Sequence, residues 1–562
     1  MHLPGLLAFV ALGAAADASQ RPHIVVIVAD DLGWADVGHH GSRQLLTPNL
    51  DALAADGLAL AQHYTQSSST ATRSALLTGL YPIHTGTQND EIKNSEPWGL
   101  PLKFKILPEY FKDLGYTTHA IGKWHLGFFR KEYTPLMRGF DHHFGFWTSH
   151  HGYYDHCSHE TYAVDGKTLS SWGLDLRRDF SVVSDRAGHY STTLFTDEAV
   201  HVIRSHNYSK PLLLYISHQA VHVGNYYHPL EAPAEHVKKF DHIRDMGRRM
   251  HAAMVSTLDE SVGRVFEALR ERRVLEDTVV AFLSSGGGDA FEPAAGSNWP
   301  LRGSKGSLWE GGTRTAALLW STKVTRPRVA TQLAHVTDWL PTLYSAAGGD
   351  ITDLGAIDGK DLWTVLVDDR PSPRTEVLYN INYQWKLAAI RIGWHKLVLG
   401  ASPEDQHDGW YEIRDTSSEH GPQVPSGADA DRAVHRALSA MGRGGVTSRR
   451  PDSPLVTVHC GLRPPDKSPA DACQPRRKPC LFDLQVDPCE YRNVAAQQKK
   501  VLARLFYRLQ ELQASGKPPL NRAPSAAANP ALHCNVWVPF MDGEIDGRAF
   551  QGQRQGGRRY RS

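Results

Sequence analysis

The segment 67–79, SSSTATRSALLTG, places serine hydroxyls before an arginine and an apolar helical run. A serine hydroxyl attacks an electrophile when a neighbouring group activates it. It also suits the cap of a helix, where it satisfies free amide donors of the first turn. Both roles fit Ser69, and the segment alone leaves them open.

Two carboxylates follow an apolar run that predicts a strand. Residues 24–29 read IVVIVA and stop at Asp30 and Asp31, as a buried parallel strand does when it ends in polar residues. Residues 212–216 and 279–283 repeat the arrangement, and each runs into a polar segment. Because ligands of open α/β sheets gather at the carboxyl ends of strands, these ends are expected to position the chemistry.

Helical periodicity separates the predicted strands. It is clearest where apolar residues recur at three- and four-residue spacing: Met254, Leu258, Val262, Val265, Phe266 and Leu269. Alternation of strand and helix predicts an α/β fold with a mainly parallel sheet flanked by helices on both faces. We assign this domain to residues 19–370.

The pattern changes near residue 370. Residues 387–400, LAAIRIGWHKLVLG, predict a hairpin of two short strands around Gly393, within a smaller C-terminal α+β subdomain at 371–545. Residues 415–475 are rich in Ser, Gly, Pro, Asp and Arg, which is typical of a long loop or insertion. Residues 546–562 form a basic tail that is either solvated or able to hold a polyanion.

Composition narrows the partners and the compartment. Lys plus Arg (61) nearly balance Asp plus Glu (60), so no strong overall field favours nucleic acid, and we expect none as a partner. Residues 1–18 match a signal peptide with cleavage after Ala18, which predicts a secreted or lysosomal protein. No later apolar stretch is long enough to span a bilayer. The sequon at Asn207 is a predicted glycosylation site.

Five of the six cysteines fall in the last quarter of the chain: Cys460, Cys473, Cys480, Cys489 and Cys534. This distribution is typical of an oxidised, loop-rich segment. Cys480 and Cys489 flank a short apolar stretch with Pro and Asp near its end. We expect this stretch to bend back and to bring the two cysteines within bridging distance.

Several segments in the same order resemble the sulfatase family, and in detail arylsulfatase B and its relatives. They are VADDLGW, SSSTATRSALLTGLYPIHTG, GKWHLG and NWPLRGSKGSLWEGG, followed by GWHKLVLG and PCLFDLQVDPCEY. The resemblance implies an alkaline-phosphatase-like fold. It also implies a sulfuric ester hydrolase scaffold for sulfated glycosaminoglycans or aryl sulfate esters.

The nucleophile position departs from the family pattern. The family has Cys-x-Pro-x-Arg and converts the cysteine to formylglycine, whereas this chain has Ser69, Ala71 and Arg73. The hydrated aldehyde carries two hydroxyls, one to attack sulfur and one to expel sulfate, but serine has one. A secreted relative with disulfides is expected to meet the cysteine-dependent converting enzyme, so formylglycine is not expected. Some microbial sulfatases convert a serine, which keeps a modified Ser69 as an alternative.

The calcium ligands implied by the resemblance are incomplete. Asp30 and Asp31 match the family's first pair, but Ser285 and Gly286 stand where a later Asp-Asn pair is expected. Calcium takes about six to eight oxygen donors, and its affinity follows the number of charged donors. Occupancy by calcium is therefore doubtful. Asp289 is a candidate substitute donor, and the alternative is an aspartate on a solvent-facing loop.

The other family positions keep their residues. The resemblance gives Lys123 and Lys305 contacts to sulfate oxygens. It gives His222 the proton for the leaving oxygen and His125 the proton from the diol, and it gives Arg73 the anchoring of the nucleophile. These roles agree with the chemistry, because a sulfate needs donors and positive charge and an alkoxide leaving group needs an acid.

Because Ser285 replaces the aspartate of the family's later Asp-Asn pair, the balance of charge around Asp30 and Asp31 changes. Either the two close carboxylates repel each other and one takes up a proton, or Lys123 and Lys305 move in to neutralise them. The second outcome leaves no sulfate site.

The leading hypothesis is a sulfatase-family protein whose turnover is lost or very weak. The first alternative is an active sulfatase that uses a modified Ser69 and a rearranged calcium site with Asp289. The second alternative is a non-catalytic protein that binds sulfated glycans, either at the old site or on the basic tail.

Overall fold

The computed structural model describes residues 21–401, 405–414, 432–443, 456–463 and 473–542. The predicted signal peptide, the basic tail and most of the predicted loop at 415–475 lie outside these residues. In the described part of the chain, no helix combines the length and the apolar character needed to cross a membrane.

A ten-stranded sheet forms the centre of the molecule, in the order β13-β2-β12-β11-β1-β10-β4-β5-β8-β9. The central strand β1 pairs in parallel with β10 and β11, and β4 pairs in parallel with β10 and β5. The bounds are β1 His23–Ala29, β2 Leu58–Leu60, β4 Thr117–Lys123, β5 His142–Phe146, β8 Arg177–Arg178, β9 Ser181–Val182, β10 Leu212–Ser217, β11 Thr278–Ser284, β12 Ala317–Trp320 and β13 Arg328–Ala330. The mainly parallel sheet and its three predicted strands are confirmed.

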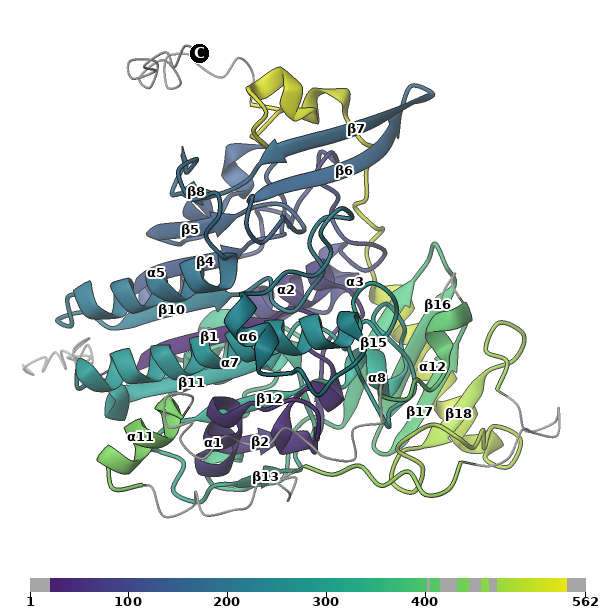
Figure 1. Ribbon diagram of the computed structural model, residues 1–562. Coiled ribbons are helices and arrows are strands. Elements are labelled where there is room, and N and C mark those ends of the chain that lie inside the picture. The colour runs from purple at the N-terminus through teal and green to yellow at the C-terminus, as the bar shows by residue number, and fades with distance from the viewer. Residues whose placement is uncertain (1–20, 402–404, 415–431, 444–455, 464–472, 543–562) are drawn as a thin grey trace, which may run out of the picture.

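Helices cover both faces of this sheet, as predicted, and α7 lies across its front in Figure 1. Alternate residues of β1 enter different cores, with Val25 and Ile27 on one face and Ile24 and Val26 on the other. The first face packs against α1 Pro48–Asp56, α5 Ser191–Ser205 and α7 Met246–Glu271. The second packs against α2 Ser69–Thr78, α4 Leu107–Asp113 and α9 Trp339–Ala346.

A separate antiparallel sheet holds the predicted hairpin. Strands β15 Glu376–Asn382, β16 Leu387–Ile392, β17 His395–Leu399 and β18 Cys480–Asp483 lie in chain order. The predicted turn at Gly393 joins β16 and β17, which pair antiparallel. Helix α12 Lys499–Ser515 packs on one face through Leu505, Leu509 and Leu512. This smaller sheet lies beside the large one in Figure 1.

Later segments of the chain return to the large sheet. Helix α11 Ala433–Ala440, inside the segment predicted as a loop, buries Val434 and Leu438 in the same core as α7. Trp537 is fully buried in the core on the other face. Val434 and Leu438 explain why this part of the predicted loop folds against the first domain.

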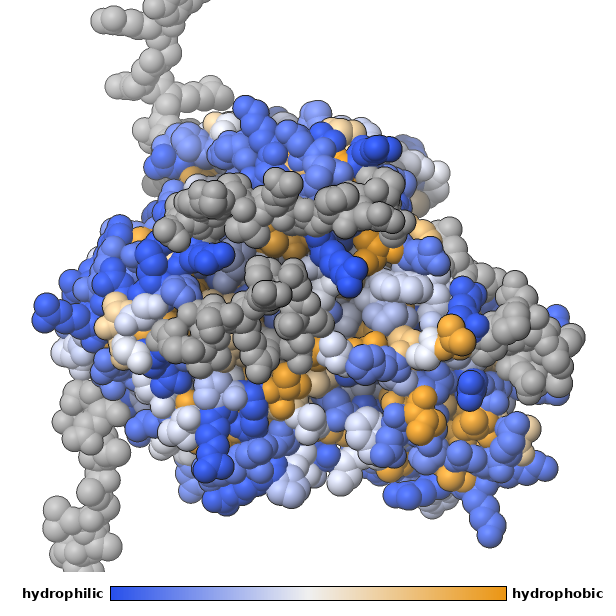
Figure 2. Space-filling view, turned by 60° about the horizontal axis from the view of Figure 1, so that its bottom comes forward, coloured by the Kyte–Doolittle hydropathy of each residue, from blue (hydrophilic) through white to orange (hydrophobic). Residues whose placement is uncertain are grey.

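The remaining elements are short or peripheral. They are β3 His63–Tyr64, β14 Ala334–His335, the hairpin β6 Cys157–Val164 and β7 Lys167–Leu174, α3 Pro82–Thr85, α6 Ala234–Lys238, α8 Glu310–Thr313 and α10 Trp363–Val367. Hydrophilic residues cover most of the face in Figure 2, and apolar residues form small separate groups there.

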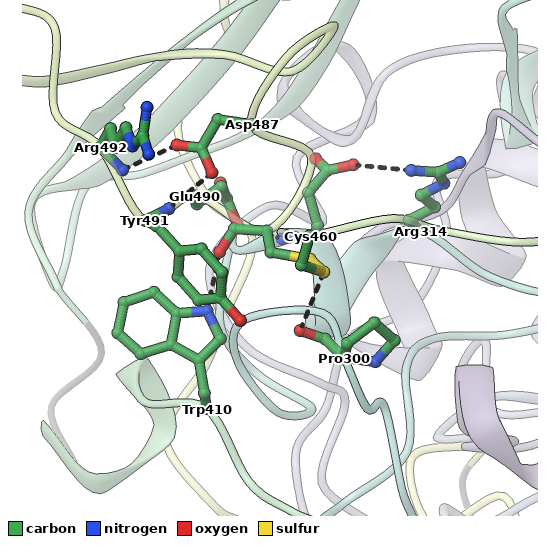
Figure 3. Close-up of a disulfide and its surroundings, with 10 residues drawn as sticks. Pro300, Arg314, Trp410, Cys460, Asp487, Glu490, Tyr491 and Arg492 are labelled. Carbon is green, nitrogen blue, oxygen red and sulfur yellow. Dashed lines mark hydrogen bonds and ion pairs between the residues drawn. A yellow bond between two sulfur atoms is a disulfide. The ribbon is translucent and has the colours of Figure 1, made fainter. Parts of the chain in front are cut away.

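The predicted Cys480–Cys489 pairing is wrong. Cys489 is bonded to Cys460, and Cys480 is bonded to Cys473. The two predicted partners belong to different cores, because β18 carries Cys480 into the core of the small sheet while Cys489 packs with the core of α7. Figure 3 shows Trp410 beside the Cys460–Cys489 bond, where its indole Nε1 donates to the Cys489 carbonyl at 2.7 Å.

Candidate functional site

The candidate site lies where the strands β1, β4, β10 and β11 of the large sheet end. Asp30 and Asp31 follow β1, Lys123 is the last residue of β4, and Ser285 follows β11. The N-terminus of α2 brings Ser69 to the same place. All the predicted site residues on these elements therefore meet at the carboxyl ends of neighbouring strands, as open α/β sheets favour.

The helix cap and the site serine are different residues. Ser68 is the N-cap of α2, and its hydroxyl accepts from the Ala71 amide at 3.4 Å. Ser69 follows as the first helical residue and donates its hydroxyl to Asp30 Oδ1 at 2.9 Å. Its side chain is therefore directed into the site rather than into the cap.

The Asp30 carboxylate is the centre of the cluster. Its Oδ1 accepts from the Ser69 hydroxyl at 2.9 Å, from the Ser285 hydroxyl at 2.6 Å and from the Arg73 guanidinium at 3.2 Å. Its Oδ2 lies 2.6 Å from Lys123 Nζ. Every one of these residues is buried. Both oxygens of Asp30 are thus occupied by donors of the protein itself.

Asp31 forms a second pair beside the first. Its Oδ2 accepts from Lys305 Nζ at 2.6 Å and lies 3.7 Å from His222 Nε2. Lys305 is the most exposed of these side chains, at 23%. Asp31 also adopts a left-handed backbone, with φ of 58°, as does His125 with φ of 55°. Asp and His tolerate this region better than most residues, and such positions cluster at functional sites.

The charges of the cluster shift its pKa values in opposite directions. Burial raises the pKa of the Asp30 carboxyl, but Arg73 and Lys123 outweigh it and hold that pKa well below its usual value. Burial raises the pKa of Asp31 to about 6, against the charge of Lys305. Burial also lowers the pKa of Lys123 to about 8, although Asp30 opposes it. Burial lowers the pKa of Lys305, but the charges of Asp31 and Glu91 outweigh it and raise that pKa above its usual value. At neutral pH the two carboxylates and the two amines are therefore charged, and the Arg73 guanidinium adds a third positive charge.

The two histidines are held as neutral rings. Burial, and next the charge of Lys305, lower the pKa of His222 to about 3, and burial also lowers that of His125. His222 Nδ1 lies 2.6 Å from the Val223 carbonyl and must carry the proton there. His125 Nε2 likewise donates to the Ile92 carbonyl at 3.1 Å, so the other nitrogen of each ring carries a lone pair.

Two further residues belong to the site and were not predicted. Ser217, at the end of β10, accepts from the Arg73 guanidinium at 3.3 Å. Glu91 lies 4.0 Å from His125 Nε2 and 3.0 Å from Lys93 Nζ. The apolar run at 212–216 predicts a strand that ends just before Ser217, and this could have indicated Ser217 as a site residue. The segment around Glu91 has no periodicity or motif that indicates a site.

The positions implied for calcium are filled differently. Ser285 donates to Asp30, Gly286 has no side chain, and Asp289 accepts from the Phe291 amide at 3.2 Å and the Ser304 hydroxyl at 3.4 Å. Among the described residues, no group of three or more His, Cys, Asp and Glu is arranged to hold a metal ion. The predicted glycosylation site, Asn207, is exposed just after α5.

Comparison with known proteins gives matches to sulfatases. The family model described as Sulfatase matches residues 22–349. Arylsulfatase J of Mus musculus is 33% identical over 540 residues, which cover 94% of this chain and 81% of that protein. N-acetylgalactosamine-6-sulfatase of Homo sapiens is 32% identical over 395 residues, which cover 68% of this chain and 72% of that protein.

Solved structures show the same fold. The crystal structure of Ps i-CgsB has a TM-score of 0.67 and 24% identity, over 92% of this chain and 98% of that one. The PsFucS1 sulfatase from Pseudoalteromonas sp. has a TM-score of 0.63 and 22% identity, over 90% and 92%. The matched family model, the two relatives and the shared fold lead to one assignment: the chain belongs to the sulfatase family.

Proposed function

We propose that this chain is a sulfatase-family protein that has lost most or all turnover of sulfate esters and retains recognition of sulfated glycans through cationic groups beside the Asp30 cluster rather than within it. One observation carries the proposal. The Asp30 carboxylate accepts from the Ser69 hydroxyl and from Lys123. The groups that the family resemblance gives to attack and to sulfate binding are therefore engaged with an aspartate of the protein itself.

The chemistry of an unmodified serine supports the loss of turnover. Attack of Ser69 Oγ on a sulfate ester forms an oxygen–sulfur bond and breaks the bond from sulfur to the substrate oxygen. The serine proton leaves with a base, and the leaving oxygen takes up a proton. The resulting sulfoserine has no second hydroxyl to expel sulfate, so the side chain stays blocked after one event.

The state of His222 supports the same conclusion. The family resemblance requires an acid for the leaving oxygen, yet the proton of the neutral ring lies on Nδ1 against the Val223 carbonyl. Nε2, which faces Asp31, carries a lone pair. General-acid catalysis needs a group that holds a transferable proton near the operating pH. A ring with its pKa lowered to about 3 holds little of that form.

The residues present do not fit calcium. Four donors occupy the Asp30 carboxylate, and Ser285 and Gly286 supply no charged oxygen. Calcium affinity depends on the number of charged oxygen ligands, and this site offers two carboxylates, each already paired with a lysine. We propose that the ammonium groups of Lys123 and Lys305 balance the two carboxylates in place of a divalent ion.

The proposed ligand class is a sulfated glycan, with aryl sulfate esters as the other class that the family resemblance offers. A relative named N-acetylgalactosamine-6-sulfatase supports the glycan. Cationic groups also stay accessible beside the site, since the side chains of Lys305 and Lys93 are 23% and 40% exposed. We also propose that the protein is secreted or lysosomal and that Asn207 carries a glycan.

The deciding experiment is mass spectrometry of the peptide that contains Ser69, on protein secreted from animal cells, together with hydrolysis of a chromogenic aryl sulfate. We expect a serine of unchanged mass and no hydrolysis above a Ser69→Ala control. Loss of two hydrogens at Ser69, together with hydrolysis that Ser69→Ala abolishes, would overturn the proposal in favour of an active enzyme.

A further inference from the structure

A groove of about 530 Å³ lies on the small antiparallel sheet, away from the strand ends that form the Asp30 cluster. It is lined by the turn before β16, by the end of β17 and by the loop before β18. We define the basic groove by Trp385, Lys386, Arg476, Arg477 and Lys478. Of its ten described lining residues, four are cationic and none is acidic. The chain as a whole is nearly neutral, so this is a local concentration of positive charge.

The cations of the basic groove stand on a short covalent loop. The disulfide Cys473–Cys480 closes a segment with a sequence separation of 7, and this segment carries Arg476, Arg477 and Lys478. Inside it, the amides of Arg477 and Lys478 both donate to the Gln474 carbonyl, at 2.8 and 3.0 Å. A loop fixed before binding loses less conformational freedom when a ligand arrives.

The opposite wall is also anchored. The Gly400 amide donates to the Pro475 carbonyl at 2.9 Å and ties the end of β17 to the covalent loop. Trp385 packs against the same core as Cys473, and its amide donates to the Asn382 side chain at 3.0 Å. An indole there offers a flat apolar face next to the cations. This combination suits a ligand with both apolar ring faces and anionic groups.

The groove is connected to the candidate site through one turn. Asn382, three residues before Trp385, donates its side-chain amide to the Asn89 carbonyl at 2.6 Å. The Tyr383 amide donates to the Asn89 side chain at 3.2 Å. Asn89 is two residues from Glu91, which faces His125. These hydrogen bonds tie the turn that carries Trp385 to the segment that carries Glu91.

From these observations we propose that the basic groove is a second binding site, for a sulfated segment of a glycan chain. The cations pair with sulfate groups, and Trp385 packs against the apolar face of a sugar ring. The inference rests on the ligand class proposed above, but it does not depend on turnover. A glycan fits better than a small anion, because four cations along a groove suit several sulfates on one chain.

The test measures binding of a chondroitin 6-sulfate hexasaccharide to the full-length protein by calorimetry. We expect the double variant Arg477→Ser, Lys478→Ser to weaken binding about five- to tenfold, since exposed ion pairs contribute up to about 1 kcal/mol each. Trp385→Ala should weaken it to a similar extent. The matched control is Lys499→Ser, Lys500→Ser, which removes the same charge from exposed positions on α12 and should change affinity less than twofold.

A second measurement uses the unaltered protein. Amine acetylation followed by mass spectrometry should show that the hexasaccharide protects Lys386 and Lys478 but leaves Lys499 and Lys500 reactive. Equal effects of the groove and control variants, with no protection, would overturn the groove and leave glycan recognition standing. If the hexasaccharide does not bind at all, both the groove and the recognition of sulfated glycans are overturned. Turnover is still judged separately, by mass spectrometry of the Ser69 peptide and by hydrolysis of the aryl sulfate. Equal affinity for a single-stranded DNA of the same charge would overturn the choice of a glycan.

Discussion

Lys123 Nζ lies 2.6 Å from Asp30 Oδ2, and both side chains are fully excluded from solvent. A buried ion pair of this kind costs desolvation on both sides, and its geometry must be good to offset that cost. Here the Ser69 and Ser285 hydroxyls and the Arg73 guanidinium satisfy the other oxygen of Asp30. The pair is therefore part of the folded core rather than a loosely held surface contact.

Removing the cation of this pair should destabilise the protein strongly. We expect Lys123→Met to lower the free energy of unfolding by about 3 kcal/mol, because Asp30 is left as a buried charge with one cation fewer. Adding Asp30→Asn to the same chain should recover part of this loss, because it removes the unpaired charge. Urea titration measures both effects.

The matched control for this experiment is Lys105→Met. Lys105 pairs with Asp113, and their side chains are 42% and 61% exposed, so the loss should stay below about 1 kcal/mol. Equal effects of Lys123→Met and Lys105→Met would contradict a buried, functional pair in the core.

Calcium should have little effect on the unaltered protein. Stabilisation by a ligand follows the ratio of its concentration to its dissociation constant, and the two carboxylates are already neutralised by lysines. With calcium at about 1 mM, we expect the melting temperature to move by less than about 1 °C relative to protein in chelator. A rise of many degrees that Asp30→Ala abolishes would show that the site binds the ion after all.

A buried charge cluster next to the small sheet should make stability depend on pH. Lys396 Nζ lies 3.0 Å from Glu310 and 2.8 Å from Glu490, and all three side chains are excluded from solvent. Burial, together with the charge of Glu310, raises the pKa of Glu490 to about 7, although Lys396 opposes the shift. The other charged or titratable groups that face the two carboxylates are Arg302, Arg314, Arg391, Tyr64 and Tyr379.

The sign of the expected effect follows from proton binding. Glu490 binds its proton more tightly in the folded state than in the unfolded state, where its pKa is ordinary. Its contribution to stability is therefore complete below about pH 4.5 and is lost as the pH rises through about 7. We expect the stability difference between the unaltered protein and Glu490→Gln to fall by about 1–3 kcal/mol from pH 5 to pH 8. A constant difference, like that expected for the exposed control Glu132→Gln, would exclude this titration.

Sequence patterns were sufficient where burial alone decides the structure. The run 24–29 became β1 because a strand inside a parallel sheet must be apolar on both faces. The hairpin β6–β7 was missed because many of its side chains are polar or exposed and give no apolar run. Its turn did carry a signal, since Asp165 and Gly166 have φ of 51° and 73°, and Asp-Gly favours such turns.

The candidate site was foreseen as a set of residues but not as a set of contacts. The resemblance to the sulfatase family could place Asp30, Lys123 and Lys305 near one another, yet it left two outcomes open for the carboxylates. The structure has a lysine on each aspartate, which is the second outcome. Burial raises the pKa of Asp31 only to about 6, so this carboxylate does not hold a proton at neutral pH. The disulfide pairing was missed for a similar reason, because nearness in sequence says little about which core a cysteine enters.

The double variant Ser285→Asp, Gly286→Asn restores the two calcium-ligand positions of the family that this chain has lost. A Cβ atom fits at position 286, because it would lie 3.7 Å from the Gln66 carbonyl oxygen and 4.0 Å from Asp31 Oδ1. The new aspartate starts from a position where the Ser285 hydroxyl is 2.6 Å from Asp30, so it brings a third carboxylate to the cluster. Without metal, repulsion among the carboxylates should make this variant less stable than the unaltered protein.

Calcium should reverse that loss, because the variant offers the ion three carboxylates and an amide oxygen. We expect calcium at about 1 mM to raise its melting temperature by several degrees, whereas the unaltered protein does not respond. The control Ser285→Asn, Gly286→Asn has the same size and one charge fewer, so it should show neither the repulsion nor a strong calcium response. If the restored variant stays insensitive to calcium while it remains folded, Lys123 and Lys305 alone suffice to exclude the ion. The absence of ligands at positions 285 and 286 would then not be the reason that the site fails to fit it.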